Sequence, residues 1–127
     1  MGFKKVGAVG YCWGGWAAFQ LGGKGKNLVD AISVAHPTFL TKEEIDDVAV
    51  PVQILAPETD PRFTPELKEH ANRVIPTLGV EYDYQYFPGL AHGFSCRADE
   101  NDEKEKRGLE RAKNAVSGWF GQMLQGR

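Results

Sequence analysis

Short apolar runs recur along the chain, with amphipathic and polar stretches between them. Three of these runs are almost continuously apolar and rich in β-branched residues: Lys5–Val9, Ala31–Ala35 and Val52–Ala56. Runs of this kind are typical of parallel strands that are buried on both faces of a sheet. A fourth run, Tyr82–Phe87, alternates apolar and polar residues, which predicts a strand at the edge of the sheet.

The stretches between the runs predict helices. Trp13–Leu21 ends at two glycines, and Thr41–Glu44 carries the sequence of a capping box. A third helix is predicted to open at Thr64-Pro65 and to end near Ile75, because Pro76 cannot continue it. The last should start near Asp102 and bury one stripe: Leu109, Ala112, Val116, Trp119, Phe120 and Met123.

This order of elements predicts an α/β fold with an open, mainly parallel sheet of about four strands and flanking helices. We find no internal repeat and no linker composition, so residues 1–127 are predicted to form a single domain. The chain is 42% hydrophobic and 25% charged, which excludes a disordered or collagen-like protein.

Charge and cysteine content narrow the partners and the compartment. The net charge of −2 gives no support to binding of nucleic acid or of an anionic membrane, and favours small or neutral partners. No apolar run is long enough to span a bilayer, and the amino end lacks the order of a signal peptide, so a cytoplasmic location is expected. Cys12 and Cys96 are then expected to be thiols rather than half of a disulfide scaffold.

The segment Gly10–Gly15, of sequence GYCWGG, lies between the first strand and the first helix. It has the pattern of a nucleophile elbow, G-x-nucleophile-x-G, with Cys12 where serine is usual. We expect side chains at positions 10 and 14 to collide with neighbouring backbone. The helix amino end should favour the Cys12 thiolate. The alternative is a buried cysteine beside a glycine-rich turn.

A nucleophile of this kind needs a base and an acid that orients the base, and in this fold they follow the nucleophile in the order acid, histidine. Asp60 follows the third strand and His92 follows the fourth, so both should meet Cys12 at the carboxyl edge of the sheet. We therefore predict that Cys12, Asp60 and His92 are catalytic. Glu58 is the competing acid, Asp60 could instead be a turn residue before Pro61, and His92 could be an ordinary loop histidine.

Other residues are weaker candidates. His36 ends the second strand and could line the same pocket, a structural role being equally compatible with its position. Cys96 and Arg97 follow His92 closely enough in the sequence to reach the site, where Arg97 could hold a substrate carboxylate. His70 lies on a polar helical face and is expected to be exposed.

Two other chemistries are disfavoured by spacing. No grouping of His, Cys and Asp has metal-ligand spacing in the sequence, so a zinc hydrolase is not expected. A redox pair of Cys12 and Cys96 is also disfavoured, because the two lie far apart in the sequence and lack the C-x-x-C arrangement.

Taken together, the GYCWGG elbow, Asp60 ahead of Thr64-Pro65, and the segment from Pro88 to Phe94 resemble the dienelactone hydrolase family of α/β-hydrolases. The resemblance runs from the first strand to the last helix. It implies hydrolysis of lactones or small carboxylic esters by a Cys-His-Asp triad, with no metal or organic cofactor. It also implies that the backbone N–H of Trp13 stabilises the oxyanion, and that Arg97, Phe94 and His36 contribute to substrate binding.

One departure from the family bears on activity. Its members carry several strands and helices ahead of the elbow strand, whereas only residues 1–4 precede that strand here. The resemblance then implies a carboxyl-terminal half-fold that lacks the second oxyanion donor, whose loss typically lowers rates by about 10²- to 10³-fold. It also leaves the first strand with a bare edge, so we expect either a homodimer or binding to the missing half through that edge. The alternative function is then that of a weak or inactive fragment that acts by association.

Overall fold

The computed structural model describes residues 5–99 and 101–125, so residues 1–4 lie outside the described residues. Its sheet has four parallel strands in the order β1-β2-β3-β4. Their bounds are β1 Gly7–Tyr11, β2 Ala31–Ala35, β3 Val52–Thr59 and β4 Tyr82–Ala91. The predicted fold class is confirmed, and the alternating strand β4 lies at an edge of the sheet as predicted.

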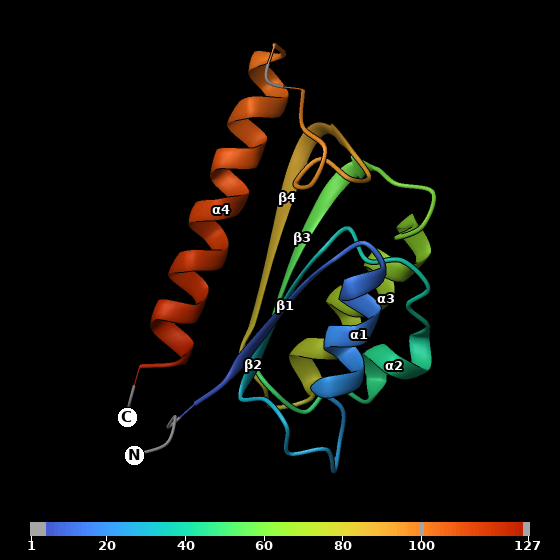
Figure 1. Ribbon diagram of the computed structural model, residues 1–127. Coiled ribbons are helices and arrows are strands. Elements are labelled where there is room, and N and C mark those ends of the chain that lie inside the picture. Colours follow the sequence, from blue (N-terminus) through green and yellow to red (C-terminus); the bar gives the residue numbers. More distant parts are fainter. Residues whose placement is uncertain (1–4, 100, 126–127) are drawn as a thin grey trace.

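Helices cover both faces of this sheet (Figure 1). α1 (Trp13–Leu21), α2 (Lys42–Asp46) and α3 (Pro65–Val74) lie on one face, and the long helix α4 (Glu103–Met123) lies on the other. A 3₁₀ turn, η1 (Ile75–Thr77), follows α3. The layers enclose two apolar clusters, the larger under α1 to α3 and the smaller under α4. Helix on sheet on helix is the usual solution for strands that are apolar on both faces.

The helix ends follow the sequence signals closely. Thr41 and Glu44 form the reciprocal capping box of α2, and Thr64 caps α3 ahead of Pro65 at the first helical position. The Asp102 carboxylate accepts from the N–H groups of Lys104 and Glu105 at the start of α4. These side chains satisfy amide groups that have no partner within the helix, which fixes where each helix begins.

The predicted stripe of α4 is partly confirmed. Ala112 and Trp119 are buried, whereas the other four residues of the stripe are half-buried, because α4 lies on the surface and contacts the sheet along a narrow line. The Trp119 indole N–H donates to the Ile32 carbonyl at 3.0 Å, which ties the helix to β2. Within the described residues, no helix combines the length and the apolar character that crossing a membrane requires.

Three expectations from the sequence were wrong in detail. β3 and β4 both run beyond the predicted ends, because Thr59 pairs with Ala91 after a bulge that leaves Pro57 opposite Phe87. The segments after Ala56 and Phe87 are therefore partly strand rather than loop. His70 is buried, not exposed, since its Nε2 contacts the Asp46 carboxylate at 2.7 Å where α2 and α3 meet.

Candidate active site

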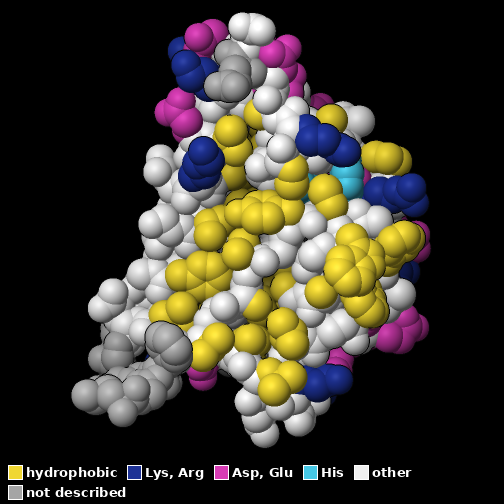
Figure 2. All heavy atoms as spheres, viewed as in Figure 1, with side chains coloured by type: hydrophobic (Ala, Val, Ile, Leu, Met, Phe, Trp, Pro, Cys, Tyr) yellow, Lys and Arg dark blue, Asp and Glu magenta, His cyan; other side chains and the backbone are white. Residues whose placement is uncertain are grey.

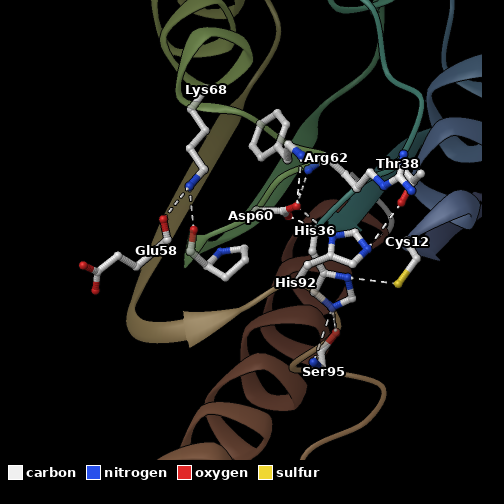
Figure 3. Close-up of polar contacts among 11 residues, drawn as sticks. Cys12, His36, Thr38, Glu58, Asp60, Arg62, Lys68, His92 and Ser95 are labelled. Carbon is white, nitrogen blue, oxygen red and sulfur yellow. Dashed lines mark hydrogen bonds and ion pairs between the residues drawn. The ribbon is translucent and has the colours of Figure 1, made fainter.

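The candidate site lies at the carboxyl edge of the sheet, where each strand ends in one of its residues. Cys12 follows β1, His36 follows β2, Asp60 follows β3 and His92 follows β4. Figure 3 shows the two imidazole rings between Cys12, Thr38 and Asp60. The parallel topology thus brings together four side chains from four separate parts of the sequence, as expected for catalytic groups in open parallel sheets.

Cys12 occupies the sharp turn between β1 and α1. Its φ of 54° and ψ of −119° lie in a region that a non-glycine residue rarely adopts. Two hydrogen bonds hold the turn: the Cys12 N–H donates to the Ala35 carbonyl at 3.1 Å, and the Cys12 carbonyl accepts from the Thr38 N–H at 2.9 Å. The side chain is half-buried. This is the strained strand-to-helix geometry that the elbow pattern predicts.

The glycine requirement of the elbow differs from the prediction. A Cβ at Gly10 would lie 2.0 Å from the Gly14 carbonyl oxygen, so Gly10 is required as expected. A Cβ at Gly14 would meet nothing within 4 Å, so the expected collision there was wrong. The tight approach is instead at Gly15, where a Cβ would lie 2.7 Å from the Pro37 Cβ. The close packing of α1 against the segment after β2 depends on Gly15.

This difference predicts opposite effects for two neighbouring substitutions. Gly10→Ala should lower the free energy of unfolding by about 2 kcal/mol or more, because a backbone carbonyl must move to admit the methyl group. Gly14→Ala should leave it unchanged or raise it by up to about 1 kcal/mol, because alanine is favoured over glycine in an open helical position. Urea denaturation of the two variants checks this pair. Equal destabilisation by both substitutions would contradict the elbow geometry.

His92 and Asp60 form a closely held pair. The His92 Nδ1 lies 2.9 Å from both Asp60 carboxylate oxygens, and the His92 N–H donates to the Thr59 carbonyl at 3.0 Å. Asp60 also accepts from the N–H groups of Arg62 and Phe63, and only 7% of it is exposed. With the Nδ1 proton directed to this carboxylate, Nε2 is free to accept. It faces the Thr38 hydroxyl at 3.4 Å.

The alternative acid and the second histidine are also placed. The Glu58 side chain accepts from the Gly89 N–H at 2.7 Å, and the carboxylate beside His92 belongs to Asp60. His36 is fully buried, and its Nδ1 lies 3.3 Å from the Cys12 sulfur (Figure 3). The centroids of the His36 and His92 rings are 5.2 Å apart, and the planes of the two rings are inclined to each other by 62°. The Cys12 sulfur therefore contacts His36, and the His36 ring in turn lies beside the His92 ring that Asp60 holds.

Burial dominates the electrostatics of the site. It lowers the pKa of His36 to about 4, assisted by the charge of His92, so this ring is neutral at pH 7. Burial also raises the pKa of the Cys12 thiol, followed by the effect of Cys96, while Arg97 acts in the opposite direction. The expectation that the helix amino end leaves Cys12 with a lowered pKa is therefore not met, since the pKa is raised and desolvation of the sulfur is the largest cause.

A cavity of about 320 Å³ opens on the His92 side of the site. Gly93, Phe94 and Arg97 line it together with His92, whereas Cys12 is not among its described lining residues. Phe94 is 3% exposed and packs on His36 and Phe87, so it offers the cavity little surface. The exposed Arg97 and Lys104 are cations in the lining of this cavity, which also contains the carboxylates of Asp102 and Glu105.

Trp13 is the first residue of α1, so its N–H has no acceptor within the helix and lies next to the Cys12 turn.

Sequence reasoning missed two residues of the site, Thr38 beside His92 and Ser95 beside His36. The Ser95 hydroxyl lies 2.6 Å from the His36 Nε2. Serine and threonine are too common in loops to be singled out by residue type. The one available signal was position, since Thr38 lies two residues after His36 and Ser95 lies three residues after His92.

Comparisons of the sequence with known proteins identify a family. The sequence profile described as the dienelactone hydrolase family matches residues 1–124. A protein named hydrolase pyvD from Aspergillus violaceofuscus is 31% identical over 125 residues, which are 98% of this chain and 50% of that protein. A human carboxymethylenebutenolidase homolog is 28% identical over 135 residues, covering 95% of this chain and 50% of that protein. The chain spans about half the length of these curated relatives.

Solved structures show the same fold at low sequence identity. The acylaminoacyl peptidase of Pyrococcus horikoshii superposes with a TM-score of 0.76 at 17% identity, covering 99% of this chain and 25% of the peptidase. The likeness places the four strands and their helices among α/β-hydrolase folds, and at this level of identity it concerns the fold alone.

Proposed function

Because this chain belongs to the dienelactone hydrolase family, we propose that it hydrolyses lactones or small carboxylic esters with a triad of Cys12, His92 and Asp60. The observation that supports the proposal is that these three residues follow β1, β4 and β3 at the same edge of the sheet, with the His92 ring held by the Asp60 carboxylate. A nucleophile, a base and an orienting acid in this order constitute the machinery of acyl transfer.

The two histidines compete for the role of base. Proximity favours His36, whose Nδ1 lies 3.3 Å from the sulfur. The pKa of His36 argues against it, because a base with a pKa of about 4 is a poor proton acceptor for a thiol whose own pKa is raised. No carboxylate orients the His36 ring in the hydrogen bonds of the described residues, whereas Asp60 orients His92 and stabilises its cation. We therefore propose His92 as the base, an assignment that requires the Cys12 side chain to turn from His36 about its Cα–Cβ bond.

The reaction follows as two acyl transfers. The Cys12 sulfur attacks the ester carbonyl carbon while His92 Nε2 takes the thiol proton, and the Trp13 N–H donates to the developing oxyanion. The intermediate collapses with cleavage of the ester C–O bond, and the leaving oxygen takes the proton from His92. Water then attacks the thioester with His92 again as base, the C–S bond breaks, and the Cys12 sulfur takes the proton back from His92. The products are a carboxylate and an alcohol, which stay joined in one molecule when the substrate is a lactone.

The cavity beside His92 suggests the substrate class. A volume of about 320 Å³ suits a small molecule, and Arg97 offers a guanidinium for a carboxylate carried by the substrate. The Phe94 and His36 rings pack against each other on this side of the site. We propose a small ester or lactone substrate, preferably anionic, rather than nucleic acid or lipid, and a cytoplasmic setting that keeps the Cys12 thiol reduced.

The experiment is hydrolysis of a matched pair of activated aryl esters, one neutral and one carrying a carboxylate. We expect turnover of both esters, a lower KM for the anionic one, and complete loss of turnover after alkylation with iodoacetamide. Turnover that survives stoichiometric alkylation of Cys12 would contradict the proposal, as would its absence from folded, reduced protein.

A second candidate function, association, is favoured by the free edge of β1. In the described part of the chain, β1 pairs with β2 alone, and Val6, Val9 and Tyr11 are 45%, 45% and 39% exposed. Figure 2 shows hydrophobic side chains gathered on this face of the molecule. Unpaired backbone groups beside apolar side chains favour pairing with another strand. We propose that the β1 strands of two copies of this chain pair with each other.

Sedimentation at several protein concentrations tests this association. We expect a monomer–dimer equilibrium that Val9→Lys shifts towards monomer, while Tyr86→Lys at the opposite edge, on β4, leaves it unchanged. A monomer at every concentration, or equal effects of the two substitutions, would contradict pairing through β1.

A further inference from the structure

Three side chains with affinity for soft metal ions converge beside the proposed triad. Cys12 comes from the elbow, His36 from the end of β2 and Cys96 from the turn after β4. The two sulfurs and a ring nitrogen of His36 all lie within 4.8 Å of one another. Sequence spacing gave no sign of this cluster, because His36 lies 24 positions after Cys12, and Cys96 lies a further 60 positions after His36.

The separations suit one ion held by all three atoms. Zinc binds thiolate sulfur at about 2.3 Å and imidazole nitrogen at about 2.0 Å, so tetrahedral angles place two sulfurs about 3.8 Å apart and a sulfur and a nitrogen about 3.6 Å apart. The Cys12 sulfur already lies 3.3 Å from the His36 Nδ1. The sulfur of the exposed Cys96 lies within 4.8 Å of both atoms, and the Cys96 N–H donates to the Gly93 carbonyl at 2.9 Å, which holds the turn that presents this side chain.

His36 is held in the orientation that a metal ligand requires. Its ring is fully buried and packs edge-on against Phe94, and its Nδ1 faces the Cys12 sulfur. Two groups of Ser95 face Nε2: the hydroxyl oxygen at 2.6 Å and the backbone N–H, which donates at the longer distance of 3.3 Å. For Nδ1 to bind a metal, the ring proton must sit on Nε2, where the Ser95 hydroxyl oxygen accepts it in place of the N–H contact. A hydrogen bond at the far nitrogen is the usual support of a metal-binding histidine.

From this geometry we infer that Cys12, His36 and Cys96 form a three-ligand site for a thiophilic divalent cation, Zn²⁺, with the fourth position open to water. Binding releases the two thiol protons to solvent, and the ion with two thiolates and one imidazole is then neutral. Arg97 and Asp60, the charged groups nearest the cluster, oppose each other in sign. The proposed catalytic sulfur is one of the ligands, so the bound ion blocks hydrolysis; this last step rests on the proposed function.

Metal binding is tested without any assay of activity. The reduced, metal-free protein is titrated with Co²⁺ under anaerobic conditions, and its Zn²⁺ affinity is measured by competition with a chromogenic chelator. We expect one ion per chain, thiolate-to-cobalt charge-transfer absorption, and Zn²⁺ affinity at least about 100-fold weaker in Cys96→Ser. Cys96 is exposed, so this variant should fold. His70→Gln removes a histidine elsewhere and should keep the affinity. Unchanged affinity in Cys96→Ser, or a cobalt spectrum without thiolate bands, overturns the site.

A second arm separates this inference from the proposed function. Rates of ester hydrolysis are compared with and without one equivalent of Zn²⁺, as a ratio for each protein. We expect more than about tenfold inhibition of the wild type, reversed by a chelator, and loss of inhibition in Cys96→Ser. Full activity of the Zn²⁺-loaded wild type overturns the blocking role. Failure of all ester hydrolysis would instead count against the proposed function, and the cobalt and chelator titrations would still decide the metal site.

Discussion

Replacing Cys12 with alanine is expected to lower kcat/KM for a small activated ester by at least about 10⁴-fold. The proposed thioester forms on the Cys12 sulfur, and removal of the nucleophile from a triad leaves only the rate supplied by the oxyanion donor and by binding. The measurement is initial-rate kinetics on protein whose circular dichroism and urea midpoint match the wild type. The substitution removes a half-buried sulfur at a turn held by backbone hydrogen bonds, so the fold should persist.

Cys12→Ser is the matched control for this effect. This substitution keeps the approximate size and the hydrogen-bonding capacity of the side chain. The serine hydroxyl is a much weaker acid than the thiol, so attack on the ester depends more strongly on proton removal by His92. We expect it to retain measurable turnover that iodoacetamide no longer inhibits. A kcat/KM of Cys12→Ala within tenfold of the wild type would remove Cys12 from the mechanism.

The second large effect concerns the choice between the two histidines. His92→Ala and Asp60→Asn should each lower kcat by about 10³- to 10⁴-fold, because the first removes the base and the second removes the charge that holds its tautomer. His36→Gln should act mainly on KM, since the buried His36 supports the substrate side of the site and is neutral at pH 7. The check is the pH dependence of kcat and KM for the three variants.

A reversed order of the two effects would contradict the choice of His92 as base. If His36→Gln lowered kcat by 10³-fold while His92→Ala lowered it less than tenfold, the ring nearest the sulfur would be the base and the assignment would be wrong. His70→Gln is the matched control, because it also removes a buried histidine, one that contacts Asp46 between α2 and α3.

The sheet and its helices could be predicted because their signals are local. Continuous apolar runs marked β2 and β3, alternation marked the edge strand β4, and Thr41, Thr64 and Asp102 marked helix starts within a few residues. The meeting of Asp60 with His92 followed from topology, since parallel strands end at one edge of a sheet.

The details that failed depend on contacts that are distant in sequence. The free space at Gly14 and the contact of Gly15 with Pro37 are set by how α1 packs on the segment after β2. The contact of Cys12 with His36, and the approach of Cys96 to both, arise from the turn after β4 folding back across the ends of β1 and β2. Periodicity and residue type do not encode such distances.

The account rests most directly on covalent attachment of the acyl group to one sulfur. The protein is mixed with an activated acetyl ester, quenched in acid within the first turnover, digested and analysed by mass spectrometry. We predict one acetyl group per chain on the peptide that contains Cys12, accumulating to a higher level in His92→Ala if deacylation slows more than acylation. Acetylation confined to Cys96, or turnover with neither sulfur acylated, would contradict the account.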